Sequence, residues 1–111
     1  MDEQAFTYST VRAMATLAEN THGRIYFVQS NGEDGPVKIG YTANDAMKRV
    51  AELASGSPYE TALLLDLPGD RALEKALHKR FAADRIRGEW FRLSDCLRWF
   101  IITMQQAQAA A

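Results

Sequence analysis

Two segments rich in aromatic and β-branched residues, residues 24–30 and 37–42, are joined by the short stretch NGEDGP. Aromatic and β-branched residues favour strands, and the Asn-Gly pair favours a chain reversal. The chain is therefore expected to contain a β-hairpin, around which the other elements must pack. Its second arm, VKIGYT, is unusual because Lys38 and Gly40 are both residues that strands disfavour.

Helical periodicity and capping residues predict four helices, and the segment YETALLLDLP at residues 59–68 predicts a third strand. The helices are expected over residues 11–20, 45–55 and 69–86, and after the capping residue Ser94. Their predicted buried stripes are Val11, Met14, Leu17 and Ala18; Met47, Val50, Ala51 and Ala54; Leu73, Leu77 and Phe81; and Leu97, Phe100, Ile101 and Met104.

This order, α-β-β-α-β-α-α, predicts an α+β domain with a small, three-stranded, mainly antiparallel sheet flanked by helices. We expect three regions: an N-terminal helical extension over residues 1–22, the domain itself over residues 23–105, and a frayed tail over residues 106–111.

Composition excludes several classes of protein. A chain of 111 residues suits one domain, and its apolar stretches are too short to span a membrane. The opening MDEQAFTYST lacks the apolar core of a signal peptide. The single cysteine, Cys96, excludes an internal disulfide and fits a reducing cytoplasm, and one cysteine with two distant histidines argues against structural zinc.

Charge is distributed unevenly along the chain, although the formal net charge is only -1. Between Arg71 and Arg98 there are eight Lys or Arg residues and four Asp or Glu residues, whereas the remainder carries five basic and ten acidic residues. This asymmetry is typical of an anion-binding face. The alternative is a pair of well-solvated helices.

Five pieces of sequence, in order, resemble the GIY-YIG nuclease superfamily and within it the T5orf172 or Mug113-like branch. They are RIYFV, VKIGYT, MKRVAEL, RALEKALHKRF and RGEWF, and they extend from about residue 24 to residue 101. The resemblance implies a three-stranded antiparallel sheet flanked by helices. It also implies cleavage of a phosphodiester with one divalent ion, Mg²⁺ or Mn²⁺.

The resemblance assigns roles to individual residues. Tyr26 matches the tyrosine of the first motif, and Lys38 stands where the second motif usually has a tyrosine. Arg49 matches the arginine that stabilises the phosphate, and Glu74 matches the glutamate that binds the metal. Two positions depart from the pattern: Arg24 replaces a glycine, and no asparagine follows Glu74 where many relatives have one.

Further residues are expected to assist. His78 is a candidate proton shuttle or phosphate contact, and supporting roles are assigned to Tyr41, Glu89 and Trp90. Gly40 would allow close approach of a phosphate backbone or a helix, or would mark a bulge. The expected nonspecific phosphate contacts are Gly40, Arg71, Lys75, Arg85 and Arg87.

Each assignment has a structural alternative. Glu74 lies in the first turn of its helix, where an acid stabilises the helix dipole. Lys38 is also what a protein places on an exposed edge strand to prevent aggregation. Arg49 is equally an exposed helix residue near Glu52, and Trp90 belongs equally well to a closing core.

We therefore expect a small metal-dependent endonuclease that acts on the phosphate backbone of DNA with little intrinsic sequence specificity. A homodimer or a protein partner would supply specificity, since no reading motif remains. The alternative is a catalytically weak or inactive GIY-YIG-like module that binds DNA or protein. A purely structural dimerisation domain is the third class, against which the charge asymmetry argues.

Overall fold

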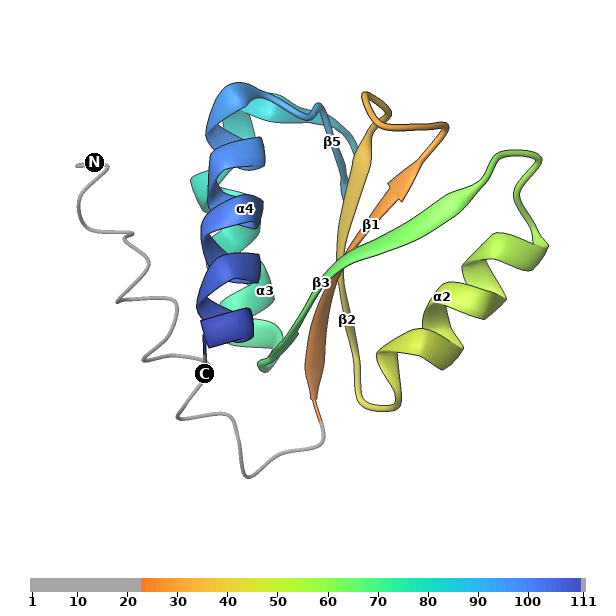
Figure 1. Ribbon diagram of the computed structural model, residues 1–111, viewed down its shortest axis with the longest axis horizontal. Coiled ribbons are helices and arrows are strands. Elements are labelled where there is room, and N and C mark those ends of the chain that lie inside the picture. Colours follow the sequence, from red (N-terminus) through yellow and green to blue (C-terminus); the bar gives the residue numbers. More distant parts are fainter. Residues whose placement is uncertain (1–22, 111) are drawn as a thin grey trace.

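The computed structural model describes residues 23–110 and shows a curved antiparallel sheet with helices on both faces (Figure 1). The predicted N-terminal helix, over residues 11–20, lies outside these residues. The strands are β1 (Arg24–Ser30), β2 (Val37–Thr42), β3 (Thr61–Pro68), β4 (Arg85–Arg87) and β5 (Trp90–Phe91). The helices are α2 (Ala46–Ser55), α3 (Arg71–Arg80) and α4 (Asp95–Ala110), with a 3₁₀ turn at Ala82–Asp84.

The sheet corrects the predicted fold. It has five strands in the order β3-β1-β2-β5-β4, not three, and every pairing is antiparallel. Within the described residues the element order is β-β-α-β-α-β-β-α with three helices. The sequence reading missed β4 and β5 because strands of three and two residues are too short to show alternation.

The missed hairpin also corrects the predicted third helix, which was expected to continue to residue 86. Helix α3 ends at Arg80, and β4 begins at Arg85. The reversal between β4 and β5 uses Gly88, whose φ of 56° suits glycine. Asp84 closes the base of this hairpin, since its carboxylate accepts hydrogen bonds from Arg92 at 2.8 Å and from Ser94 at 2.6 Å.

The β1–β2 hairpin forms as predicted, with both strands at the expected bounds. Asn31 and Gly32 adopt positive φ values of 65° and 89° in the connecting loop, the conformation that Asn-Gly favours. Tyr26 pairs with Gly40, and Val28 pairs with Lys38.

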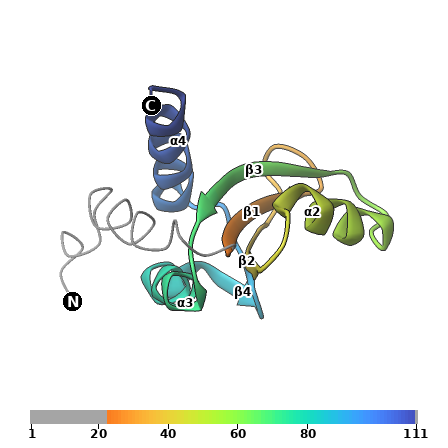
Figure 2. The same ribbon diagram turned by 90° about the horizontal axis from the view of Figure 1, so that it is seen from below.

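Alternation along the strands creates two apolar layers. Helix α2 lies on one side of the sheet, and α3 and α4 lie on the other, as Figure 1 and Figure 2 show from two directions. The larger layer lies under α3 and α4 and is built on Ile25, Phe27, Ile39, Leu65, Leu73, Leu77, Phe81, Phe91, Leu97, Ile101 and Met104. The smaller lies under α2 and contains Tyr26, Val28, Ala46 and Val50.

Helix α2 begins where the sequence predicted, because the Asp45 carboxylate accepts hydrogen bonds from the backbone of Met47 and Lys48. Its buried face is Ala46 and Val50. The prediction that Met47 and Ala51 are buried is wrong, since both are exposed, Met47 to 59%. Alanine is small and only weakly apolar, so Ala46, Ala51 and Ala54 do not show by periodicity which face of the helix is buried.

Helices α3 and α4 bury the predicted stripes, Leu73, Leu77 and Phe81 on one and Leu97, Ile101 and Met104 on the other. Helix α4 runs to Ala110, through the segment expected to be frayed. The amides of Gln105 and Gln108 donate hydrogen bonds to backbone oxygens of β3, at 2.7 and 2.8 Å, and so tie this last part to the sheet. Among residues 23–110, no helix is long and apolar enough to cross a membrane.

Candidate active site

Tyr26 and Gly40 face each other across the central pair of strands, on the side of the sheet that α2 covers. Tyr26 is only 1% exposed, and its ring passes over Gly40. A Cβ atom at Gly40 would collide with the Cζ and Oη atoms of the tyrosine. Glycine is therefore required in the strand because the phenol occupies the space of its side chain.

Arg49 projects from α2 to the hydroxyl end of Tyr26. A hydrogen bond with Tyr26, followed by one with Glu52, raises the pKa of the Arg49 guanidinium above its ordinary value. The bond to Glu52 is 3.2 Å long and exposed. Arg49 therefore contacts Glu52, as its structural alternative expects, and also lies beside Tyr26, while its phosphate-binding role stays a prediction.

Lys38 lies two residues from Gly40 on the same strand face, roughly 6.5–7 Å away along an extended strand. Its ammonium forms an ion pair with Glu89, at 2.8 Å between Nζ and Oε1, and lies 5.9 Å from the centre of the Trp90 ring. The edge-guard interpretation is wrong at this position, because Lys38 pairs with Trp90 on β5 and is inside the sheet.

Glu74, on α3, is the buried carboxylate of the site. Only 8% of the residue is exposed, and Oε2 is buried without any hydrogen-bond donor among residues 23–110. Burial and the neighbouring Glu89 carboxylate raise the pKa of Glu74, while His78 and Arg71 partly oppose that rise. Arg71 reaches only the other oxygen, at 3.8 Å.

Glu89 connects Glu74 to Lys38. Burial opposes ionisation of Glu89, but the hydrogen bond and charge of Lys38 outweigh it, so the pKa of Glu89 lies below its ordinary value. The two carboxyl groups are close enough to share a proton. Their pKa values move in opposite directions, because burial disfavours the ionised form of Glu74 whereas Lys38 favours that of Glu89.

The backbone of Ile39 positions both Glu89 and His78. Its N–H donates to the carbonyl of Glu89 at 3.0 Å, and its carbonyl accepts a hydrogen bond from Nε2 of His78 at 2.8 Å. Ile39 lies one residue beyond Lys38, which pairs with Trp90, the first residue of β5. The imidazole thus bonds to β2 where no strand residue pairs with it, and its ring centre lies 5.1 Å from that of Phe91. Because Nε2 carries the proton, Nδ1 is the nitrogen left for chemistry.

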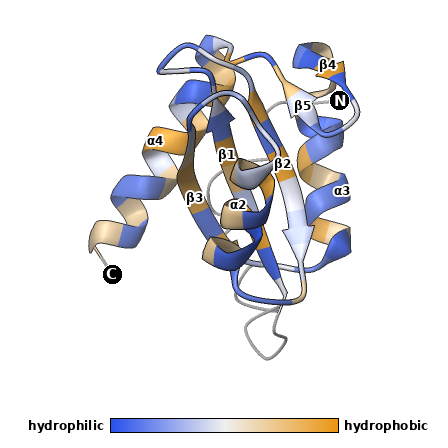
Figure 3. Ribbon diagram, turned by 90° about the vertical axis from the view of Figure 1, so that its right-hand side faces the viewer, coloured by the Kyte–Doolittle hydropathy of each residue, from blue (hydrophilic) through white to orange (hydrophobic). Residues whose placement is uncertain are grey.

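The structure thus brings four predicted residues, Lys38, Glu74, His78 and Glu89, into one connected group. Tyr26 and Arg49 form a second pair, on the face of the sheet that α2 covers, where Tyr26 lies across from Gly40, two residues from Lys38 on β2. In Figure 3, seen from the side of α2, α3 lies beyond β2, on the side of the sheet where β4 and β5 also lie.

Four of the five predicted phosphate contacts are exposed on α3 and β4, whereas the fifth, Gly40, is buried on β2 beneath the Tyr26 ring. Arg71 and Lys75 are exposed on α3, and the Arg71 guanidinium stacks 4.6 Å from the Tyr41 ring. Arg85 and Arg87 are exposed on β4. Tyr41 belongs to the layer under α3 and α4, so it lies on the opposite sheet face from Tyr26.

The carboxylates can accept a cation, but they do not form a complete cage. Among residues 23–110, no three His, Cys, Asp or Glu side chains gather with metal-ligand geometry. Two carboxyl groups with an unpartnered buried oxygen suit one hard divalent ion whose other ligands are water and substrate oxygens. This arrangement fits an ion held together with a phosphate.

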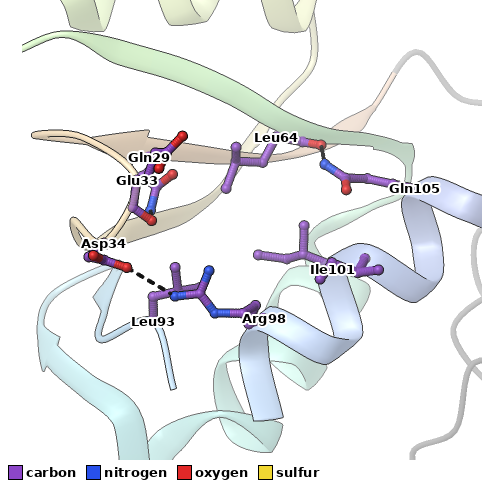
Figure 4. Close-up of a pocket in the computed structure, with 9 residues that line it drawn as sticks. Gln29, Glu33, Asp34, Leu64, Leu93, Arg98, Ile101 and Gln105 are labelled. Atoms are coloured by element: carbon purple, nitrogen blue, oxygen red, sulfur yellow. Dashed lines mark hydrogen bonds and ion pairs between the residues drawn. The ribbon is translucent and has the colours of Figure 1, made fainter. Parts of the chain in front are cut away.

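A separate hollow of about 410 Å³ lies on the face of the sheet that α4 covers, between the β1–β2 loop, β3 and α4 (Figure 4). Leu64, Leu93 and Ile101 line it, and the Arg98–Asp34 ion pair of 3.3 Å crosses its mouth. Its lining includes none of the predicted site residues.

Sequence reasoning named the side chains of the group but missed what joins them. The backbone of Ile39 and the Gly88 turn decide where Glu89 and His78 lie. Gly88, in the segment RIRGEW of residues 85–90, was the available signal for a hairpin.

Fold and site together define a small α+β domain with an antiparallel sheet, in which a buried carboxyl group, Glu74, lies next to the Glu89–Lys38 ion pair. The T5orf172 domain model matches residues 23–109, and the chain belongs to that domain family. The family is associated with GIY-YIG-like or HNH-like endonucleases, which indicates a nuclease-like or DNA-binding module. No curated protein and no solved structure matches the chain significantly.

Proposed function

We propose that the protein is an endonuclease that hydrolyses phosphodiester bonds of DNA with the help of one Mg²⁺ or Mn²⁺ ion. The observation that carries this proposal is the buried Oε2 of Glu74, which has no hydrogen-bond partner among residues 23–110 and belongs to a carboxyl group next to Glu89, within a group that includes Lys38. A buried carboxylate costs free energy unless it is paired. Its retention among basic residues argues for a cation ligand, and membership of a nuclease-associated family supports the same function.

The proposed roles follow from position. Arg49 presents a planar, permanently charged fork to the phosphoryl oxygens. The Tyr26 hydroxyl, held beside that guanidinium, orients the attacking water, and Lys38 adds positive charge on the same face. When bound at Glu74, the divalent ion supplies stabilisation of charge on the phosphate and the leaving oxygen.

His78 acts chiefly as a positioning residue in this proposal. Its Nε2 is committed to the carbonyl of Ile39, so the imidazole fixes α3 against β2 and leaves Nδ1 to accept or donate a proton near the carboxyl pair.

The exposed basic residues of α3 and β4 would bind the phosphate backbone without reading sequence, namely Arg71, Lys75, Arg85 and Arg87. Sequence choice would then come from DNA structure, from a protein partner or from a second copy of the chain. We propose the cytoplasm as the compartment.

A second candidate function is a DNA-binding or protein-interaction module that does not cleave efficiently. One observation favours it: the charge of Lys38, at a position where the motif that the sequence resembles usually has a tyrosine, is neutralised by Glu89 at 2.8 Å. A module, however, has no need of a buried, unpartnered carboxylate.

Incubation of the purified protein with supercoiled plasmid and with branched DNA, in Mn²⁺ and in EDTA, separates the two. The nuclease proposal expects nicking or cutting in Mn²⁺ only, with full activity in Glu60→Gln, an exposed carboxylate in the α2–β3 loop that serves as the matched control. Salt-sensitive DNA binding without cleavage of any substrate would support the module instead.

A further inference from the structure

Glu89 has two partners of opposite kind. Its Oε1 lies 2.8 Å from the Lys38 ammonium, and its carboxyl group is also in hydrogen-bonding range of Glu74. Its backbone is fixed independently, because its carbonyl accepts the 3.0 Å hydrogen bond from the N–H of Ile39. The side chain is therefore presented from the residue before β5, whose backbone is bonded to β2, and lies between a cation and a second acid.

Lys38 is correspondingly engaged. Its side chain is 15% exposed, packed toward the Trp90 ring and paired with Glu89. A phosphate that Lys38 is to bind must therefore compete with the Glu89 carboxylate for the same ammonium group.

A cation bound at Glu74 would draw Glu89 away from Lys38. Its buried Oε2 has no donor among the described residues, and the nearest acid is Glu89. A divalent cation placed against this oxygen would attract both carboxylates, since hard cations take carboxylate oxygens as ligands. Attraction of Glu89 toward that cation weakens its hold on Lys38.

We infer that Glu89 is a shared carboxylate, which neutralises Lys38 in the cation-free protein and becomes the second protein ligand of the cation that Glu74 binds, thereby releasing Lys38 to the substrate phosphate. The inference rests on the proposed function, because it requires a cation at Glu74. It makes cation binding and DNA binding mutually reinforcing, since each favours the same arrangement of Lys38 and Glu89.

The test measures Mn²⁺ binding by calorimetry or electron paramagnetic resonance, and short-duplex binding in Ca²⁺ and in EDTA at matched ionic strength, with the duplex checked for intactness. The variants are Glu89→Gln, Glu74→Gln and the control Glu60→Gln. Glu89→Gln should bind Mn²⁺ roughly ten-fold more weakly, or weaker still. In EDTA it should bind DNA as tightly as the unchanged protein does in Ca²⁺, because Lys38 is already released.

Each failure has its own signature. If the unchanged protein shows no Mn²⁺ binding that depends on Glu74, the proposed function fails. If Glu74→Gln abolishes Mn²⁺ binding but Glu89→Gln binds as the unchanged protein does, Glu89 is not a ligand and this inference alone is overturned. Weaker Mn²⁺ binding in Glu89→Gln with unaltered DNA binding in EDTA would equally overturn the exchange with Lys38.

Discussion

The phenol ring of Tyr26 occupies the space directly above Gly40, its partner across the β1–β2 pair. The glycine costs the strand packing and backbone entropy, yet it lets a fully buried tyrosine place its hydroxyl beside Arg49. Gly40, the residue of β2 with the lowest strand preference, thus permits the proposed catalytic tyrosine to reach its position.

Gly40→Ala is expected to destabilise the protein by about 1–3 kcal/mol, because an added methyl must displace a buried ring. Urea unfolding measures this change. Gly56→Ala is the matched control: nothing lies within 4 Å of its Cβ position, and its φ is -98°. Equal losses of stability in the two variants would show that the tyrosine does not fill the space above Gly40.

Glu74→Gln is expected to make the cation-free protein more stable by about 1 kcal/mol at pH 8, since it removes the penalty of an unpartnered buried carboxylate. The pKa of Glu74 is raised by burial and by Glu89, so its contribution to stability is present below the ordinary value of 4.5 and is lost as pH rises through the folded-state pKa.

The advantage of Glu74→Gln should therefore grow with pH, as thermal unfolding at pH 4 and pH 8 in EDTA would show. An advantage that is the same at both values would contradict the raised pKa. Saturating Mn²⁺ should reduce or reverse the difference, because it stabilises only the protein that binds it.

Asp84→Asn is expected to cost about 1–2 kcal/mol at pH 7, because Asp84 receives charge-assisted and hydroxyl hydrogen bonds from Arg92 and Ser94. Burial opposes ionisation of Asp84, but these partners outweigh it and lower its pKa. Its stabilising contribution is thus present above the ordinary value of 3.8 and disappears as pH falls through the lower folded-state pKa.

Acid unfolding followed by circular dichroism measures this effect, and Asp84→Asn should shift the midpoint to higher pH. Asp34→Asn, which removes an exposed partner of Arg98, should change stability by less than about 0.5 kcal/mol. If the acid midpoints of Asp84→Asn and the unchanged protein coincide, Asp84 does not anchor the β4–β5 hairpin.

Arg49→Lys keeps the positive charge but loses the planar fork, and we expect DNA cleavage to fall by roughly ten-fold or more with stability almost unchanged. Initial rates of plasmid nicking measure the loss. Arg98→Lys, on the far side of the sheet and paired with Asp34, should cleave at the normal rate. Full activity of Arg49→Lys would remove the bidentate phosphate contact from the mechanism.

The contrast between the two hairpins explains how much of the fold the sequence predicts. Strands β1 and β2 are seven and six residues long and flank an Asn-Gly turn, so pattern and turn chemistry agreed and their bounds were predicted correctly. Strands β4 and β5 have three and two residues and form because Asp84 and Gly88 shape their ends. Such tertiary support leaves no periodicity to detect.

The candidate site was likewise predicted only in part from the sequence. Residue types and family resemblance named Tyr26, Arg49 and Glu74. The Lys38–Glu89 ion pair, however, joins residues 51 positions apart, one on β2 and one in the β4–β5 turn, and the pairing of β2 with β5 that brings them together was not predicted. The burial of Glu74 could not be predicted either, because its position in the first turn of a helix is explained equally well by an exposed acid that stabilises the helix dipole.

The most direct test of the central claim compares the unchanged protein with Glu74→Gln, at equal folded concentration, in a time course of supercoiled-plasmid nicking with Mn²⁺. A parallel DNA-binding assay in EDTA shows whether the variant still binds. The account predicts nicking by the unchanged protein, complete loss of nicking in Glu74→Gln, and DNA binding retained. Nicking by Glu74→Gln at the rate of the unchanged protein would contradict it.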